Sequence, residues 1–172
     1  MFPLSSLNAA FTGGSGLGLF GGTTTNKSSR LYRALVSGEL AAGIFGSMAP
    51  TIDPYLFSVG AVVRAGQEID AVEEALQAEI GRLESQPITE EELRKALKRA
   101  RVEFAAASES VSGQGQMLGY AEIVAGDYRW AEEALDRISS VTLDDVSRAR
   151  AAYLQPHNCT VARYIPHGNG SG

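Results

Sequence analysis

Apolar residues recur with a helical period over most of the second half of the chain. Between residues 68 and 86, the side chains of Ile69, Val72, Leu76 and Ile80 are three or four positions apart, which places them on one face of a helix. Similar spacing returns four more times towards the C-terminus. The pattern predicts helices over residues 68–86, 88–109, 116–126, 129–138 and 142–154.

Three other stretches have the composition of β-strands. Residues 40–49 are small and apolar, residues 54–64 alternate apolar and small side chains, and residues 157–165 alternate again. The connection between the first two is short and contains Pro50 and Pro54, which favours antiparallel pairing. We therefore predict an α+β fold, with an antiparallel-rich sheet that is covered on one face by the helices.

Polar residues at the ends of the helical stretches give local detail. Thr89 and Glu92 fit a capping box, and so do Thr142 and Asp145, while Asp127 is a plausible cap for the helix that follows it. A short helix is also predicted just before the first strand, with Ser28 or Ser29 as its cap. We expect Gly38 to end that helix in a left-handed conformation.

The N-terminal part of the chain is rich in glycine. We divide the sequence into a glycine-rich segment, 1–27, with a short helix around Ser5–Phe11, a main domain, 28–166, and a flexible tail, 167–172. Residues 16–21 match G-x-G-x-x-G, but no strand-like run precedes them and no acidic residue ends the strand that follows. A flexible loop is therefore favoured over a dinucleotide site.

Composition adds bounds on the class of protein. The chain has 172 residues, of which 44% are hydrophobic and 20% charged, and its net charge is −5. The length suits one domain with a core, and the charge favours neither nucleic acid nor an anionic membrane. No apolar run is long enough for a membrane span, and the N-terminus lacks the basic start of a signal peptide. The single cysteine, Cys159, leaves the compartment open, with the cytoplasm as the default and the periplasm as an alternative.

The sequence offers only weak candidates for an active site within this chain. A serine nucleophile needs a histidine base on a shared scaffold, which the sequence does not supply. Cys159 and His157 are placed on one face of the predicted strand, where a buried cysteine is commoner than a reactive thiolate. Acidic residues at a helix start suit the helix dipole and do not indicate a metal site. These serines and acids are Ser108, Ser110, Ser112, Glu68, Asp70, Glu73 and Glu74.

Four segments together resemble one family. SSRLYRALV (28–36), PITEEELRKALKRARVEF (87–104), MLGYAEIVAGDYRW (117–130) and ISSVTLDDVSRARAAYL (138–154) have the order and rough spacing of the pitrilysin/insulinase zinc peptidases, which include the mitochondrial processing peptidases. The resemblance covers about residues 20–165, and it is to the second, non-zinc domain of a processing-peptidase-like subunit.

The resemblance implies that the chemistry lies outside this chain. The family binds zinc through an inverted H-x-x-E-H motif, whereas this chain has only two histidines, His157 and His167, ten residues apart. We therefore expect no catalytic and no metal-binding residue in this chain. The zinc is expected in a domain upstream or on another chain. An arginine and a tyrosine in the metal-free half of such enzymes hold the scissile carbonyl. Their matching positions, Val36 and Ala42 or Gly43, cannot donate a hydrogen bond from the side chain.

The resulting functional hypothesis is a non-catalytic companion domain of a zinc metallopeptidase, which walls a cavity and helps to hold peptides. The alternative is a structural module descended from processing peptidases, without proteolysis. Expected partners are a zinc-bearing domain and a peptide substrate, and a dimer is left open. The resemblance also implies a strand and a helix before the glycine loop. Residues 1–15 are too few and too polar to supply both, so we expect an unpaired sheet edge and dependence on a neighbouring domain.

Overall fold

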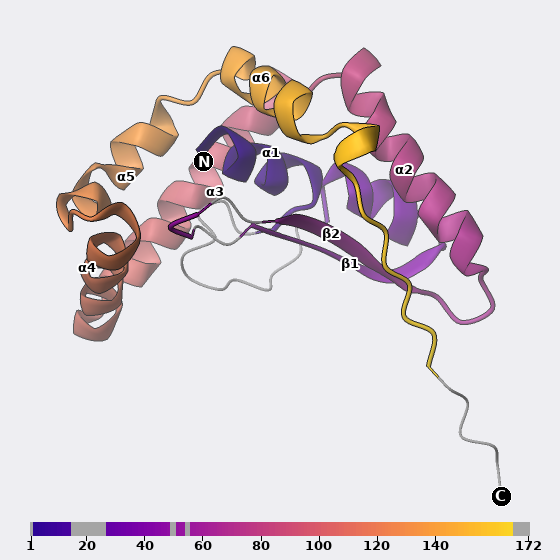
Figure 1. Cartoon of the computed structure of the whole chain (residues 1–172), viewed down its shortest axis with the longest axis horizontal. Helices are drawn as coiled ribbons and strands as arrows, with labels where there is room; N and C mark the ends of the chain where they lie inside the picture. The colour runs from indigo at the N-terminus through magenta and orange to yellow at the C-terminus, as the bar shows by residue number, and fades with distance from the viewer. Residues whose placement is uncertain (1, 15–26, 49–50, 54–55, 167–172) are drawn as a thin grey trace, which may run out of the picture.

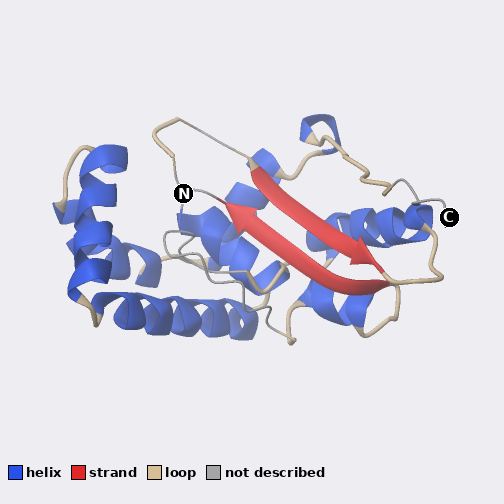
Figure 2. Cartoon of the chain, turned by 90° about the horizontal axis from the view of Figure 1, so that it is seen from below, coloured by secondary structure: helices blue, strands red, loops and turns tan. Residues whose placement is uncertain are grey.

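The computed structural model describes residues 2–14, 27–48, 51–53 and 56–166. Figure 1 shows the helices gathered on one side of a two-stranded sheet, and the strands lie in front of them when the molecule is viewed from below (Figure 2). The predicted α+β fold with helices on one face is confirmed. In chain order the elements are α1 (Phe2–Phe11), η1 (Tyr32–Val36), β1 (Ala41–Met48), β2 (Phe57–Val63), α2 (Ile69–Ser85), α3 (Glu90–Ser108), α4 (Val111–Ala125), α5 (Arg129–Ser139), α6 (Leu143–Tyr153) and η2 (Pro156–Asn158).

Helix α1 lies in the centre of the largest core. Every residue from Ser5 to Phe11 is buried, and α1 contacts α3, α5, α6 and β1. The predicted short helix is therefore present, begins earlier than Ser5, and packs with elements of the predicted main domain. The boundary at residue 27 remains a prediction, and the G-x-G-x-x-G stretch, 16–21, lies outside the described residues.

The sheet is antiparallel, as the short connection predicted. Ile44 pairs with Ala61 and Met48 pairs with Phe57. Because side chains alternate between the faces of a strand, these pairs place the apolar side chains of both strands against the helices. Among the described residues the sheet contains β1 and β2 alone.

The prediction of a third strand over 157–165 is wrong. After η2, residues 159–166 form no regular secondary structure, and their side chains are exposed. Alternation indicates which residues could share a strand face, but a strand also needs a neighbouring backbone to pair with. Here the segment is held by a side chain instead, because Arg163 forms ion pairs with Asp70 and Glu73 of α2, both at 2.6 Å.

The turn after η1 also differs from the prediction. Gly38 does not take the left-handed conformation; Glu39 does, with a φ of 61°. Gly38 is needed for a steric reason, because a Cβ atom there would overlap the carbonyl oxygen of Ala34. The predicted serine cap is present in weak form, since the Tyr32 amide lies 3.4 Å from Ser29 Oγ. Residues 32–36 then form a π-helical turn instead of an α-helix.

The remaining helices follow the predicted pattern, with one earlier start. Both predicted capping boxes are present, at Thr89 and at Thr142. Helix α4 begins at Val111 and not at residue 116, because Ser110 Oγ accepts the Gly113 amide at 3.0 Å and offsets the weak helix formers that follow. Asp127 accepts the Arg129 amide at 2.9 Å at the start of α5. No helix in the described part of the chain is long and apolar enough to cross a membrane.

Candidate functional site on the open face of the sheet

The two faces of the β1–β2 sheet differ in burial. On the helix side Ile44 is 5% exposed, whereas on the other side Phe45 is 55% exposed and Val62 is 56% exposed. In Figure 2 no helix lies in front of this second face. We call it the open face; its residues are the cross-strand pairs Gly43–Val62, Phe45–Gly60 and Ser47–Ser58.

Small residues keep the open face shallow. A Cβ atom added to Gly60 would overlap the ring of Phe45, so the ring lies directly across the glycine. The other pairs contribute two serines, and at Gly43 an added Cβ would meet nothing within 4 Å. Glycine allows another backbone to come close to a strand. The open face thus combines two exposed apolar side chains with open space at Gly43, whereas the space at Gly60 is taken by the Phe45 ring.

A β-bulge lies at one end of this face. Ala41 pairs with Val63 and Gly43 pairs with Val62, so Ala42 is an extra residue without a partner opposite it. Bulges re-aim the side chains beside them and are frequent next to functional sites. Ala42 and Gly43 are two of the positions that the sequence resemblance matched to the carbonyl-holding residues.

The third matched position, Val36, lies on η1 and is packed against the main core. Elements η1 and β1 contact each other, so the structure brings the three matched positions onto adjoining elements. None of their side chains carries a hydrogen-bond donor, and the absence of a carbonyl-holding side chain from this chain remains a prediction from the sequence.

A buried polar cluster fixes β1 against the end of α1. The Thr12 hydroxyl lies 2.7 Å from Asn8 Oδ1, and the Gly14 amide donates to Thr12 Oγ1 at 3.0 Å. A Cβ atom on Gly46 would overlap Thr12 Oγ1 and lie 2.5 Å from Asn8 Oδ1. Gly46 therefore permits the close approach of β1 to the end of α1.

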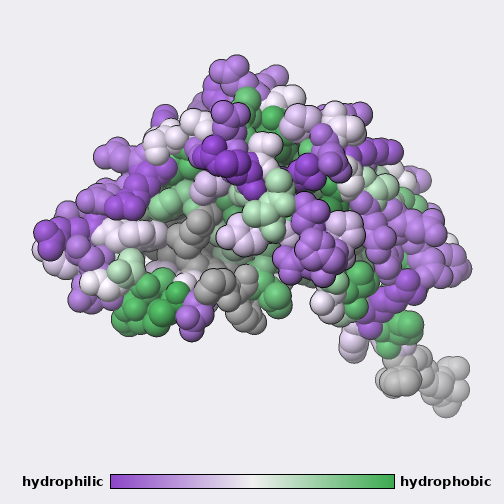
Figure 3. All heavy atoms as spheres, turned by 45° about the horizontal axis from the view of Figure 1, so that its top comes forward, coloured by the Kyte–Doolittle hydropathy of each residue, from purple (hydrophilic) through white to green (hydrophobic). Residues whose placement is uncertain are grey.

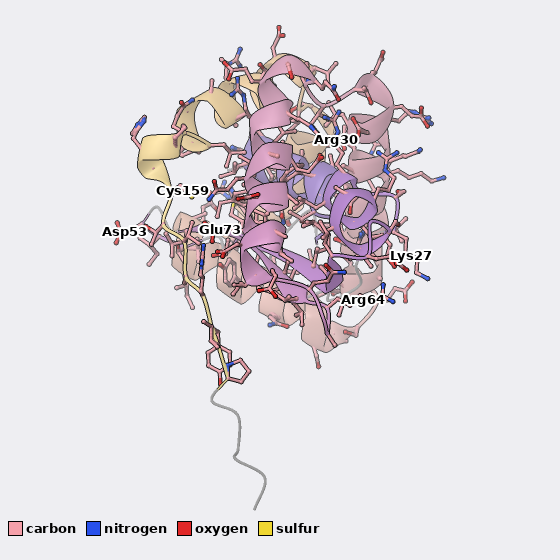
Figure 4. All side chains as sticks on the ribbon, turned by 90° about the vertical axis from the view of Figure 1, so that its right-hand side faces the viewer. Lys27, Arg30, Asp53, Arg64, Glu73 and Cys159 are labelled. Carbon is pink, nitrogen blue, oxygen red and sulfur yellow. The ribbon has the colours of Figure 1, made fainter. Side chains whose placement is uncertain are left out.

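An ion pair fixes the segment that precedes β1. Arg30 donates to both carboxylate oxygens of Glu92, at 2.7 and 2.6 Å, and to the carbonyl oxygens of Gln86 and Pro87, at 2.5 and 2.8 Å. Figure 4 shows Arg30 on the side of the molecule where α2 and α3 meet. All these partners lie around the α2–α3 connection and the start of α3, so the contact ties η1 to both helices.

The protonation of Glu92 is strongly biased by these contacts. Burial favours its neutral form, but the hydrogen bonds from Arg30 and Thr89 outweigh burial and lower the pKa of Glu92 to about 2. Glu92 thus serves both the capping box and the ion pair. Sequence reasoning found the capping box and missed the ion pair, because nothing in the pattern relates positions 62 residues apart.

The other residues considered from the sequence form no active constellation in the structure. His157 and Cys159 are exposed around η2 and do not share a strand face, and His167 lies outside the described residues. Ser108 donates to the Phe104 carbonyl and Ser110 caps α4. In residues 2–14, 27–48, 51–53 and 56–166, no three histidine, cysteine, aspartate or glutamate side chains gather as a metal site.

Residues 1–100 match the family model described as the inactive domain of peptidase M16. The chain belongs to this family. The resemblance to the pitrilysin/insulinase zinc peptidases is thereby confirmed, and so is the assignment to their non-zinc domain. No match was found among curated proteins.

Solved structures agree with this assignment to the M16 inactive domain. A candidate zinc protease from Bordetella pertussis Tohama I is 32% identical, with a TM-score of 0.80 over 96% of this chain and 85% of that one. The inactive peptidase domain of a candidate zinc protease from Bordetella parapertussis is also 32% identical, with a TM-score of 0.78 over 99% of this chain and 88% of that one. A protease from Helicobacter pylori, 20% identical, shares the fold with a TM-score of 0.69 over 90% of this chain and 34% of its own length.

Membership in the M16 inactive-domain family indicates which domain binds the zinc. The zinc of this family lies in the catalytic domain, and the inactive domain is its companion. The M16 inactive domain described here therefore implies a partner that carries the zinc-binding residues.

Proposed function

We propose that this M16 inactive domain forms one wall of a peptide-holding chamber and helps to position extended peptides for hydrolysis by a zinc domain elsewhere. The observation that carries the proposal is the open face of the sheet. Phe45 and Val62 are more than half exposed there, although the opposite face of the sheet packs on the helices, with side chains that are buried on β1 and partly buried on β2. Exposed apolar residues grouped on one face mark a contact surface more often than single ones do.

The shape of the open face suits a polypeptide ligand. Gly43 leaves space through which a peptide backbone can approach, while Phe45 and Val62 offer apolar contacts to its side chains. The buried Asn8–Thr12–Gly46 cluster and the Arg30–Glu92 pair hold the strands and η1 in place from the opposite side. A surface supported in this way needs little ordering when it binds, which lowers the entropic cost of association.

The test uses the assembly of this chain with its zinc-bearing partner and a fluorogenic peptide. Val62→Glu places a charge on the open face, and Val102→Glu, on the outer side of α3, is the matched control because Val102 is 61% exposed. We expect Val62→Glu to raise the KM for peptide hydrolysis by about tenfold, which corresponds to about 1.4 kcal/mol. Val102→Glu should leave the KM unchanged.

Equal KM values for the two variants, with both assemblies intact by size-exclusion chromatography, would contradict the proposal. They would favour a structural module that contributes no contact to the peptide. The isolated chain is expected to show no chelator-sensitive peptide cleavage, because H-x-x-E-H is absent from its sequence.

A further inference from the structure

A second candidate site lies away from the open face, where α4 and α5 meet the start of α1. The cavity there has a volume of about 320 Å³, and its lining includes Phe2, Tyr120, Val124, Trp130 and Arg137. Helices α4 and α5 form one end of the molecule (Figure 1). Neither the family assignment nor the proposed wall function accounts for an aromatic cavity at this place.

Stacked aromatic side chains form part of the cavity wall. The rings of Phe2 and Trp130 are stacked, with centroids 5.4 Å apart and an angle of 17° between their planes. The stack leaves Trp130 half-buried, while the small residues Ala121 and Ala131 are buried where α4 and α5 pack together. Tyr120 also lines the cavity, and partial burial raises the pKa of its hydroxyl group. A cavity of this size and lining suits a single bulky apolar side chain.

The stretch of chain that contains α4 and α5 is acidic overall, although, among the described residues, the one charged side chain in the cavity lining is Arg137. Residues 109–139 carry six acidic side chains and two arginines, so this stretch holds four of the five net negative charges of the chain. Both arginines are paired within it, Arg137 with Glu133 at 2.6 Å and Arg129 with Asp127 at 3.2 Å. The acids that remain include Glu132 and Asp136, which are exposed on α5. A binding segment with positive charge is therefore favoured near this cavity.

We propose that the cavity between α1, α4 and α5 binds one bulky apolar side chain of a basic polypeptide segment. The aromatic walls supply the affinity for the apolar side chain, and the acidic helices around them select a segment with lysine or arginine on either side. The proposal does not depend on peptide hydrolysis or on the open face, so the two proposals can fail separately.

Trp130 makes the test direct, because it is the only tryptophan of the chain. The full chain would be titrated with a short peptide that has one phenylalanine flanked by lysines, while tryptophan fluorescence is recorded. We expect a saturable change that weakens as salt is added, since screening reduces the attraction between exposed charges. A peptide with alanine in place of phenylalanine, and one with glutamates in place of the lysines, should each bind at least tenfold more weakly.

Variants of the chain separate a specific site from general attraction. Ala125→Phe would fill the cavity from an exposed position and should abolish the fluorescence response, whereas Ala105→Phe, at an exposed position on α3, should not change it. The double change Glu132→Lys and Asp136→Lys should remove the preference for the basic peptide. Circular dichroism would show that each variant is folded.

Three results would overturn the proposal. The first is no fluorescence response to the basic phenylalanine peptide. The second is an equal response to the alanine peptide, which would mean that charge alone drives binding. The third is a change in the Trp130 signal with protein concentration and without peptide, together with a larger sedimenting species, which would assign the cavity to a second copy of the chain.

Discussion

The main core and the α4–α5 end of the molecule differ in how much they bury. In the main core Phe11, Leu31 and Leu35 are completely buried, and α1, η1, β1, α2, α3 and α6 all contribute to it. At the α4–α5 end the buried cluster consists of Met117, Ala121 and Ala131. On the face of the molecule that Figure 3 shows, hydrophilic side chains predominate and hydrophobic side chains gather in a few places.

This contrast separates the part that holds the fold from the part that is free to make contacts. Alanine buries little apolar area, so the α4–α5 cluster contributes much less to stability than the main core. The same helix α4 leaves Ile123 72% exposed and Leu118 40% exposed. The family model matches residues 1–100, which contain most of the main core and none of α4 or α5. We therefore expect the two regions to respond differently to equivalent changes.

The largest expected effect is in the main core. Leu35→Ala should lower the free energy of unfolding by about 2–5 kcal/mol, because the leucine is completely buried in the main core and its truncation would leave a cavity there. Met117→Ala should cost less than this, since Met117 is 8% exposed and the other buried members of its cluster are two alanines. Urea denaturation of both variants measures the difference. Equal losses would mean that the α4–α5 end is as firmly packed as the main core.

The next effect concerns the ion pair that ties η1 to α3. Glu92→Gln should cost about 1–3 kcal/mol, because Arg30 loses its charged partner while remaining largely buried. The pKa of Glu92 is lowered to about 2 in the folded chain, so its contribution is present above the ordinary carboxyl pKa and is lost as the pH falls from about 5 towards 2. The variant should therefore lose less stability than the parent over that range. Parallel curves of unfolding free energy against pH for the two proteins would refute this role of Glu92.

A substitution that adds one methyl group tests the contact between β1 and α1. Gly46→Ala should destabilise by about 1–3 kcal/mol, because the new Cβ would overlap Thr12 and Asn8 in a closed polar cluster. Gly43→Ala is the control on the same strand, since its Cβ would meet nothing within 4 Å. Thermal unfolding of both variants is sufficient. If Gly43→Ala were the more damaging change, the placement of the strand faces would be wrong.

The smallest expected effect is local. Ser110→Ala removes the side-chain cap of α4 and should cost about 0.5–2 kcal/mol of helix stability. Because α4 adds little to the main core, hydrogen exchange should quicken in α4 and α5, while the amides of α1 and η1 keep their protection. A uniform increase in exchange across the chain would instead show that α4 and α5 open only with the rest of the molecule.

Much of the fold follows from local patterns. The 3.6-residue spacing located α2, α3, α5 and α6, and two capping boxes marked helix starts at Thr89 and Thr142, because these signals depend on residues within one or two turns. The antiparallel β1–β2 pair followed from its short connection. The family was recognisable from ordered segments of the sequence, and the missing H-x-x-E-H motif already placed the zinc outside this chain.

What only the tertiary structure decided depends on residues far apart in the chain. The alternation over residues 157–165 predicted that this segment pairs with a strand. In the structure it contacts α2 instead, through the ion pairs of Arg163. The serines and Asn8 of α1 concealed its central place, because the hydrogen bond from Thr12 to Asn8 that satisfies a polar side chain inside the core cannot be read from the sequence. Likewise, the open face and the aromatic cavity arise from how elements pack, and a one-dimensional pattern records which faces are apolar but not which of them remain uncovered.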